Sequence, residues 1–451
     1  MIDKKQTIAA IATPPGKGGI GIIRLSGPQT LKTLQALGVQ NTAARLACFN
    51  HFRNSIGETL DQGISIYFPG PESYTGEDVA EIQAHGGQFV LNSILEEILT
   101  YGVRLARPGE FTERAFLNGK LDLLQAEAVS DLIESSSTEA LQSALRSLNG
   151  QFSERIDALL KSVVEIRVFV ESALDFPDEE IDFLKESDIQ EKLSDVLNSS
   201  SALLQSARRG RLFSEGVNIA IIGPPNAGKS SLLNFLARSE RAIVTAIPGT
   251  TRDTLEDRVV LDGIPVTVVD TAGIRTTSDP IELEGIKRTG QAAKEADLLI
   301  YVREAGSYSD ADISYDIPIP ASTPIVNLYN KIDLQNEPAE IKLSAKNSAV
   351  VFLSIKTGSG TGLMKQEIKR LLGLSESAET GLSARTRHVA ALNKTQEHLI
   401  SAQKKLVATK PAAELVAEEL LAAQKNIEEI TGESTADDLL GKIFSNFCIG
   451  K

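Results

Sequence analysis

The spacing of apolar residues sets an N-terminal region, residues 1–117, apart from the rest of the chain. Short apolar runs alternate here with glycine and proline, and the runs at 19–25 and 63–68 predict strands that end in turns. Residues 91–99 have the spacing of an amphipathic helix. This mixture predicts a small α+β domain.

Glycine becomes rare after residue 120, and apolar residues then recur with the period of a helix. The clearest series is Leu159, Val163, Ile166, Val170 and Leu174. We expect Pro177 to end this helix, and residues 188–206 predict the next one. Three more helices are predicted at 387–406, 412–430 and 437–447.

Two helical stretches, 118–212 and 379–451, therefore flank a central block, 213–378. The block contains short apolar runs that lead into polar or glycine-rich loops, as the strands of an α/β domain do. We predict one discontinuous helical-bundle domain with this block inserted, because domain termini often lie close together at the surface. The segment 375–386, rich in Ser, Gly and Thr, is the predicted linker out of the block.

A phosphate-binding pattern lies near the start of the block. Residues 223–230 have glycine at the first and sixth positions and end in Lys-Ser, and the apolar run 219–222 precedes them as a buried strand would. A helix is predicted at 231–236, so backbone N–H groups and the helix N-terminus would face the phosphates. We expect Lys229 to reach the β- and γ-phosphates and Ser230 to bind Mg²⁺.

Three later loops extend this pattern to a guanine nucleotide. Residues 270–273, DTAG, follow a second apolar run, and the Asp suits a Walker-B role beside Mg²⁺. Residues 330–333, NKID, follow a third run, and Asp333 is expected to accept two hydrogen bonds that guanine donates and adenine does not. Residues 354–356 take the place of the last base-contacting loop, with Ile355 where alanine is usual.

The group that orients the attacking water is not the usual one. Ras-like GTPases carry Gln directly after the DTAG glycine, and Ile274 stands there in this chain. The segment 275–284 carries three candidate carboxylates, Asp279, Glu282 and Glu284, each of which also fits a solvated helix start. The loop 245–253 lies where the first switch belongs, and Asn226 suits a monovalent cation whose charge would replace an arginine finger.

Composition narrows the class of protein further. The 451 residues fit about three domains, and the net charge of −14 argues against a broad basic face for nucleic acid. Two cysteines, Cys48 and Cys448, imply no disulfide framework and favour a reducing compartment. No apolar run approaches about 18 residues, and the run 8–12 is too short for a signal peptide, so we expect a cytoplasmic protein without membrane spans. The C-terminal residues after Cys448 fit a prenylation box badly.

Longer stretches of the sequence resemble a known family. The motifs PPNAGKSSLLN, IPGTTRD, DTAGIR and NKID resemble those of the potassium-activated GTPases. Over essentially its whole length, the chain is similar to the tRNA modification GTPase MnmE (TrmE) family. The motifs that are specific to this family lie outside the central block. That similarity is carried by ATPPGKGGIGIIRLSG, SYTGEDVAEIQAHGG, ARPGEFTERAFLNGKLDLLQAEAVSDLI, LDFPDEEIDF and DDLLGKIFSNFCIGK. The departures are Ile355, Pro248 in the first switch, and Arg303-Glu304.

The resemblance implies a multidomain α/β and α+β architecture. It comprises an α+β tetrahydrofolate-binding and dimerisation domain at 1–117, helical-bundle parts at 118–212 and 379–451, and an inserted Ras-like P-loop GTPase domain at 213–378. It also implies addition of a carboxymethylaminomethyl or similar group at C5 of the wobble uridine in tRNA, by a homodimer in a heterotetramer with the FAD-dependent MnmG subunit. The implied cofactors are GTP with Mg²⁺, K⁺, and 5-formyl- or 5,10-methylene-tetrahydrofolate as one-carbon donor.

Site residues follow from the resemblance position by position. The implied folate contacts are Arg24, Glu81, Lys120 and Lys451. The implied K⁺ shell is Asn226, Thr245, Ile247 and Thr250, and the Mg²⁺ ligands are Ser230 and Thr251. Glu282 would orient water, and Glu282, Lys229 and Cys448 are the implied catalytic residues. The implied GTP contacts are Asn226, Ala227, Gly228, Lys229, Ser230, Ser231, Thr245, Ala246, Ile247, Pro248, Gly249, Thr250, Thr251, Asp270, Thr271, Ala272, Gly273, Asn330, Lys331, Asp333, Ser354, Ile355 and Lys356.

The residues by themselves leave alternatives open at the folate and tail positions. Arg24 can pair with a folate carboxylate, although an isolated arginine at a strand end is usually solvated. Glu81 can accept hydrogen bonds from a pterin ring or be a surface acid, and a buried cysteine such as Cys448 is more often inert than reactive.

Two other functions compete with tRNA modification. One is a regulatory GTPase switch that binds RNA or the ribosome without modification chemistry; binding of a formyl-tetrahydrofolate would separate it from the modification hypothesis. The other is a folate-dependent methyltransferase with a vestigial GTPase, against which the intact phosphate and base motifs argue.

Asn226 and the missing Gln together predict a cation dependence. GTP hydrolysis should be sharply faster in K⁺ than in Na⁺ at equal ionic strength, because the cation supplies charge against the phosphates. Initial rates of phosphate release in the two salts measure this. Equal rates would contradict the cation mechanism.

Overall fold

The computed structural model describes most of the chain. The described residues are 6–175, 188–239, 256–261, 264–270, 293–294, 296–308, 315, 319, 323–374, 381–408, 413–432, 437–445, 447 and 449–450. The chain divides into two compact units by its internal contacts. The first consists of Met1–Ser130, Ser147–Leu197 and Lys394–Lys451, and the second of Asp131–Arg146 and Asn198–Asn393.

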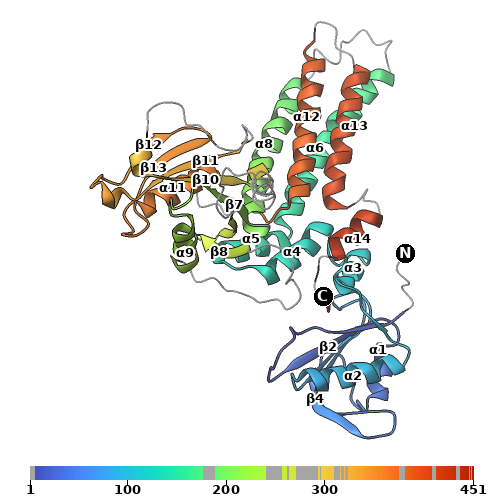
Figure 1. Cartoon of the computed structure of the whole chain (residues 1–451). Coiled ribbons are helices and arrows are strands. Elements are labelled where there is room, and N and C mark those ends of the chain that lie inside the picture. The colour runs from blue at the N-terminus through green and yellow to red at the C-terminus, as the bar shows by residue number, and fades with distance from the viewer. Residues whose placement is uncertain are drawn as a thin grey trace, which may run out of the picture. The chain divides into compact units, whose positions relative to one another are not determined.

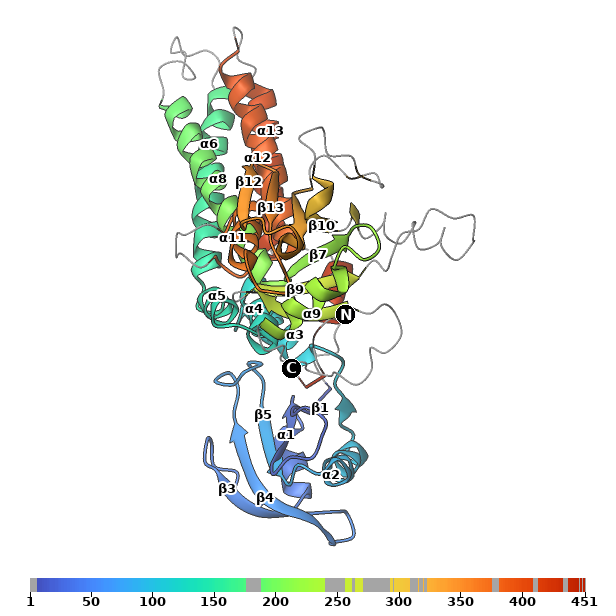
Figure 2. The same cartoon turned by 60° about the vertical axis from the view of Figure 1, so that its left-hand side comes forward.

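A six-stranded sheet with the order β3-β4-β5-β2-β1-β6 forms the N-terminal region. The elements are β1 (Ile8–Ile11), β2 (Gly21–Ser26), α1 (Thr30–Ala36), β3 (Cys48–Arg53), β4 (Thr59–Phe68), β5 (Val79–Ala84), α2 (Gln88–Thr100) and β6 (Arg104–Leu105). Helices α1 and α2 lie next to the strands of this sheet (Figure 2). Side chains that alternate along β2 and β5, such as Ile23 and Ile82, form one core with side chains of these helices. The α+β prediction for this region is confirmed.

One predicted strand is too short. The apolar run 63–68 marks only the second half of β4, which begins at Thr59. The first half has one apolar side chain, the partly buried Leu60, and is strand because its backbone pairs with β3, where His51 lies opposite Gln62. A single apolar residue makes no periodic pattern, so apolar periodicity does not reveal this half.

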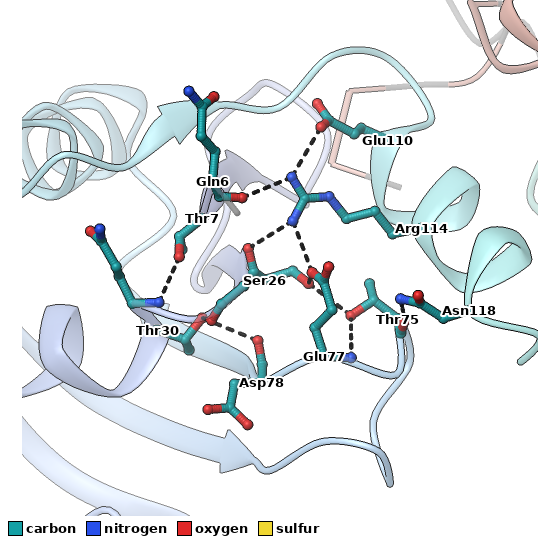
Figure 3. Close-up of polar contacts among 12 residues, drawn as sticks. Gln6, Thr7, Ser26, Thr30, Thr75, Glu77, Asp78, Glu110, Arg114 and Asn118 are labelled. Carbon is teal, nitrogen blue, oxygen red and sulfur yellow. Dashed lines mark hydrogen bonds and ion pairs between the residues drawn. The ribbon is translucent and has the colours of Figure 1, made fainter. Parts of the chain in front are cut away.

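A buried network of charged groups joins helix α3 (Glu110–Leu117) to this sheet (Figure 3). Arg114 is 2% exposed and donates to Glu77 Oε2 at 2.8 Å, to Gln6 O at 2.9 Å and to Glu110 Oε1 at 3.2 Å. Glu110 is fully buried and also accepts from Arg104 at 2.6 and 3.0 Å. Each buried charge thus faces an opposite charge, which offsets the cost of removing it from water.

In the first unit, α6 (Gln151–Asp175) and α13 (Ala413–Thr431) run alongside the parts of α8 (Ile189–Ser214) and α12 (Thr386–Leu406) that belong to it (Figure 1), as the 3.6-residue period predicts. The other helices of these stretches are α4 (Leu123–Glu134), α5 (Thr138–Leu148) and α14 (Asp437–Ser445). Helix α6 packs along α13, and Val163 and Val170 from the predicted series are fully buried. Pro177 lies outside the described residues.

Helix α8 runs eight residues beyond its predicted end at residue 206. Gly210 does not end the helix; it lies where the helix comes close to the backbone of Leu382. A Cβ at Gly210 would overlap the backbone oxygen of Leu382, so only glycine lets the segment 381–385 cross the helix at this point.

The second sheet has seven strands in the order β12-β13-β11-β10-β7-β9-β8. Its elements are β7 (Val217–Ile222), α9 (Lys229–Ser239), β8 (Glu256–Leu261), β9 (Ile264–Asp270), β10 (Leu298–Glu304), β11 (Ile325–Asn330), β12 (Glu340–Ser344), β13 (Ser348–Phe352) and α11 (Thr361–Leu371). The edge strands β8 and β12 pair antiparallel and the other neighbours pair parallel. This is the Ras-like α/β arrangement that the motif order predicts.

The buried network predicts how the N-terminal sheet responds to acid. Burial by itself would raise the pKa of Glu110, but hydrogen bonds from Arg104 and the Arg107 N–H, with the charges of Arg104 and Arg114, lower it from 4.5 to about 2. The ionised carboxylate therefore stabilises the folded state by about 3 kcal/mol above pH 4.5, and this stabilisation is lost as the pH falls from about 4.5 towards 2. At pH 7, Glu110→Gln should raise hydrogen–deuterium exchange at least about tenfold in peptides from β1, β2 and α3.

Glu113→Gln on the same helix is the matched control. Burial raises the pKa of Glu113, so its charge is not favoured by folding, and exchange should stay within about twofold of wild type. Equal effects of the two variants would show that Glu110 has no special stabilising role.

Candidate functional site

The phosphate loop follows β7 and leads into α9, as predicted. Lys229 is the first residue of α9 and is 9% exposed. Its Nζ donates to Gly223 O at 2.8 Å and to Pro224 O at 2.9 Å, so the ammonium group is held against the loop. Asn226 lies in the left-handed region with φ 63° and is exposed, which leaves its carboxamide accessible to a ligand.

The base-recognition loop is tied to this phosphate loop by the carboxamide of Asn330. Asn330 Nδ2 donates to Ala227 O at 2.9 Å, and Asn330 Oδ1 accepts from the Ile355 N–H at 3.1 Å. A Cβ at Gly228 would overlap Asn330 Nδ2, so glycine is required for the two loops to come this close. Three segments far apart in sequence therefore meet at one side chain.

Asp333 is oriented by the last loop of the motif series. Ser354 Oγ donates to Asp333 Oδ1 at 2.6 Å, which leaves Oδ2 to accept from a ligand. Lys331 has φ 70° and forms an ion pair with Glu304 at the end of β10. The Ile355 N–H donates to Asn330 Oδ1.

A cavity of about 720 Å³ lies between these loops. Eight of the predicted GTP contacts line it: Asn226, Gly228, Ser231, Asn330, Lys331, Asp333, Ile355 and Lys356. Three lining residues were not predicted: Asn234, Phe235 and Leu334. Asn234 and Phe235 follow Ser231 by three and four positions on α9, so helical spacing from Ser231 would have revealed them. The volume suits a ligand of nucleotide size.

The remaining predicted residues are described only in part. Asp270 ends β9 opposite Ile221 of β7, next to the phosphate loop, and only its backbone is described. Ser230 follows Lys229 on α9 and is exposed. The following lie outside the described residues: Thr245, Ala246, Ile247, Pro248, Gly249, Thr250, Thr251, Thr271, Ala272, Gly273, Ile274, Asp279, Glu282, Glu284, Cys448 and Lys451.

A second cluster of predicted residues lies on the N-terminal sheet. Arg24 is in the middle of β2 and not at a strand end, and its Nη2 contacts Glu81 Oε1 on β5 at 2.8 Å. The two residues therefore pair with each other, and their side chains are 23% and 20% exposed. The Arg24 guanidinium also lies 5.5 Å from the ring centroid of Tyr74 and 5.9 Å from that of Phe111.

Lys120 is exposed and lies beside the loop that carries Tyr74. A Cβ at Gly76 would contact Lys120 Cγ at 3.4 Å, and Asn118 Nδ2 donates to Thr75 O at 2.7 Å. Tyr74 and Phe111 were not predicted, although both stand in the stretches SYTGED and GEFTERAF that carry the family resemblance.

The C-terminal tail approaches the same sheet. A Cβ at Gly450 would lie 2.5 Å from Ile11 O, at the end of β1 and next to Ala10, which pairs with Arg24. Phe444 and Phe447 form a buried cluster with Phe116 of α3. Of the residues on either side of Cys448, Phe447 therefore packs near α3 and Gly450 lies against β1.

The fold and the cavity together define a P-loop GTPase. In the comparison with family models, the "MnmE helical domain" matches residues 123–448 and the "GTP-binding protein TrmE N-terminus" matches residues 7–120. The chain therefore belongs to the MnmE (TrmE) family of tRNA modification GTPases, which confirms the resemblance found in the sequence.

Curated relatives match over the whole length. The tRNA modification GTPase MnmE of Proteus mirabilis is 47% identical over 99% of both chains, and that of Saccharophagus degradans is 46% identical over 99% of both. Among solved structures, the G domain of the T. maritima FeoB iron transporter covers 34% of this chain and 98% of that chain, at 24% identity and a TM-score of 0.24. A similarity at that level supports no structural argument. Within the described residues, no helix has the length and apolar character needed to cross a membrane.

The Asp333 geometry predicts a change of base specificity. Asp333→Asn presents an amide donor where guanine also donates, so GTP affinity should fall at least about 100-fold, whereas xanthosine triphosphate, with a carbonyl at that position, should bind better. Competition titrations with the two nucleotides measure the ratio.

Asp297→Asn is a control in the same unit, since Asp297 pairs with Arg211 at 2.7 Å away from the cavity. It should leave the ratio of the two affinities unchanged. An Asp333→Asn variant with an unchanged ratio would contradict the assignment of Asp333.

Proposed function

We propose that this chain hydrolyses Mg²⁺-bound GTP in the cavity between the phosphate loop and the base loop, and that it uses the hydrolysis in tRNA modification. The observation that carries the proposal is the Asn330 carboxamide, which joins Ala227 to Ile355 and so fixes the base loop against the phosphate loop. Asp333, oriented by Ser354, would accept from guanine, and Lys229 would neutralise the terminal phosphates.

In the hydrolysis step, water attacks the γ-phosphorus and the bond to the β–γ bridging oxygen breaks, giving GDP and phosphate. The protein contributes position and charge, with little covalent chemistry of its own. Ser230 and Thr251 would hold Mg²⁺, and Asn226, with Thr245, Ile247 and Thr250, would hold K⁺ beside the phosphates. Glu282 would orient the attacking water.

The N-terminal sheet would bind the one-carbon donor, a 5-formyl- or 5,10-methylene-tetrahydrofolate. Arg24 and Glu81 offer donors and an acceptor side by side, the rings of Tyr74 and Phe111 lie next to them, and Lys120 lies beside the same loop. A folate has a hydrogen-bonding pterin ring and a carboxylate tail, so paired polar groups next to aromatic rings suit it. Cys448 and Lys451 would extend this site, because Gly450 lies against β1.

The relatives in Proteus mirabilis and Saccharophagus degradans are named tRNA modification GTPases, and the match over the full length supports the same role here. The finer steps proposed are an aminomethyl-type addition at C5 of the wobble uridine, a homodimer, and a heterotetramer with the FAD-dependent MnmG subunit. A regulatory GTPase switch is the competing function. The Arg24–Glu81 cluster favours modification, since a switch needs no such site.

Arg24→Gln tests the folate site and the function together. The variant should bind a formyl-tetrahydrofolate about tenfold or more weakly in equilibrium dialysis, because a charge-assisted hydrogen bond is lost. In cells that lack the wild-type chain, it should leave the wobble uridine largely unmodified when tRNA nucleosides are analysed.

Arg53→Gln is the matched control, since Arg53 is an exposed arginine on β3 of the same sheet, away from Arg24. It should behave as wild type. If wild-type chain binds no formyl-tetrahydrofolate and restores no tRNA modification, the regulatory switch is favoured.

A further inference from the structure

Ile355 belongs both to the core of the second unit and to the wall of the cavity. Its side chain is 8% exposed and packs within the apolar cluster under the seven-stranded sheet. It also lines the cavity together with Asn330 and Gly228. Because Ile355 is held by the core, its packing restricts the movement of the cavity wall that it forms.

The end of the Ile355 side chain reaches the phosphate loop. Gly228 has no Cβ, but the position that one would take lies 3.9 Å from Ile355 Cδ1, so the side chain ends beside this residue. Ala227, the preceding loop residue, belongs to the same buried apolar cluster as Ile355. Alanine, the usual residue here, lacks the Cγ1 methylene and the Cδ1 methyl group that extend this far. The apolar side chain beside the phosphate loop therefore comes from this chain's departure from the common motif.

A second link runs through the backbone of the same residue. The Ile355 N–H donates to Asn330 Oδ1, and Asn330 Nδ2 donates to Ala227 O. Ile355 is thus linked to Ala227 through the Asn330 carboxamide, and its apolar side chain ends beside Gly228. Separation of the base loop from the phosphate loop would break these hydrogen bonds and expose the Ile355 side chain.

We propose that Ile355 is a positioning residue that locks the base loop onto the phosphate loop and so slows nucleotide release. It acts through Asn330 and Gly228, and the contacts that read guanine stay with Asp333. Release of a nucleotide held by both loops requires them to separate, so a stronger lock lowers the dissociation rate. The inference rests on the proposed nucleotide site.

Two substitutions remove the side chain in steps. Ile355→Val deletes Cδ1, the atom that approaches Gly228, and should raise the dissociation rate of GDP about threefold. Ile355→Ala should raise it about tenfold or more. The full-length chain is loaded with GDP carrying a methylanthraniloyl fluorophore, and the decay of fluorescence is followed after excess unlabelled GDP is added with Mg²⁺.

Ile368 provides the matched control. It is fully buried in the same apolar cluster and does not line the cavity. Ile368→Val and Ile368→Ala should lower the melting temperature as the Ile355 variants do, and leave GDP dissociation within about twofold of wild type.

Three results would overturn the proposal. GDP dissociation from Ile355→Ala within twofold of wild type would show that the side chain is no lock. An equal acceleration in Ile368→Ala would show that any core defect loosens the site. If Ile355→Ala fails to fold, Ile355→Val decides in its place. A wild-type chain that does not retain labelled GDP would refute the nucleotide site itself.

Discussion

The carboxamide of Asn330 is the contact on which the nucleotide site depends. A buried amide must satisfy both its donor and its acceptor, and here each partner belongs to a different loop: Ala227 O on one side and the Ile355 N–H on the other. The site can therefore form only when β7, β11 and β13 lie in the register that the sheet gives them. Without that register, Asp333 and Lys229 would have no fixed relation to each other.

In the N-terminal region, the buried polar groups that must be satisfied are charged, and ion pairs satisfy them. Arg114 has almost no contact with water, so its guanidinium must find acceptors from Gln6, Glu77 and Glu110, which lie on three separate segments. Gln6 lies just before β1 and Glu77 just before β5, so these bonds fix α3 against the sheet, and with it the ring of Phe111 beside Arg24. A charged network in the interior of the domain thus places the buried Phe111 ring next to the partly exposed Arg24.

Local patterns predicted most of the elements and the heart of the nucleotide site. A buried strand followed by GxxxxGKS or NKID specifies its own loop, so Lys229, Asn330 and Asp333 fall where the sequence puts them. Contacts between distant segments were not predictable in this way. Asn330 and Ala227 are 103 positions apart, and nothing in either local pattern identifies the other. Tyr74 was missed for the same reason, since it lies in a loop and its neighbour Arg24 lies on β2, 50 positions earlier in the chain.

Glycines account for much of what the sequence did not predict. In a sequence they suggest turns, but Gly210 lies inside α8 because the segment 381–385 crosses the helix there. Ser214 then donates to Ala384 O, and Thr386 Oγ1 donates to Glu215 Oε2 at 2.6 Å. The two chain segments that lead into and out of the second sheet are thereby held side by side. The predicted insertion of 213–378 would need its two ends to lie close together in this way.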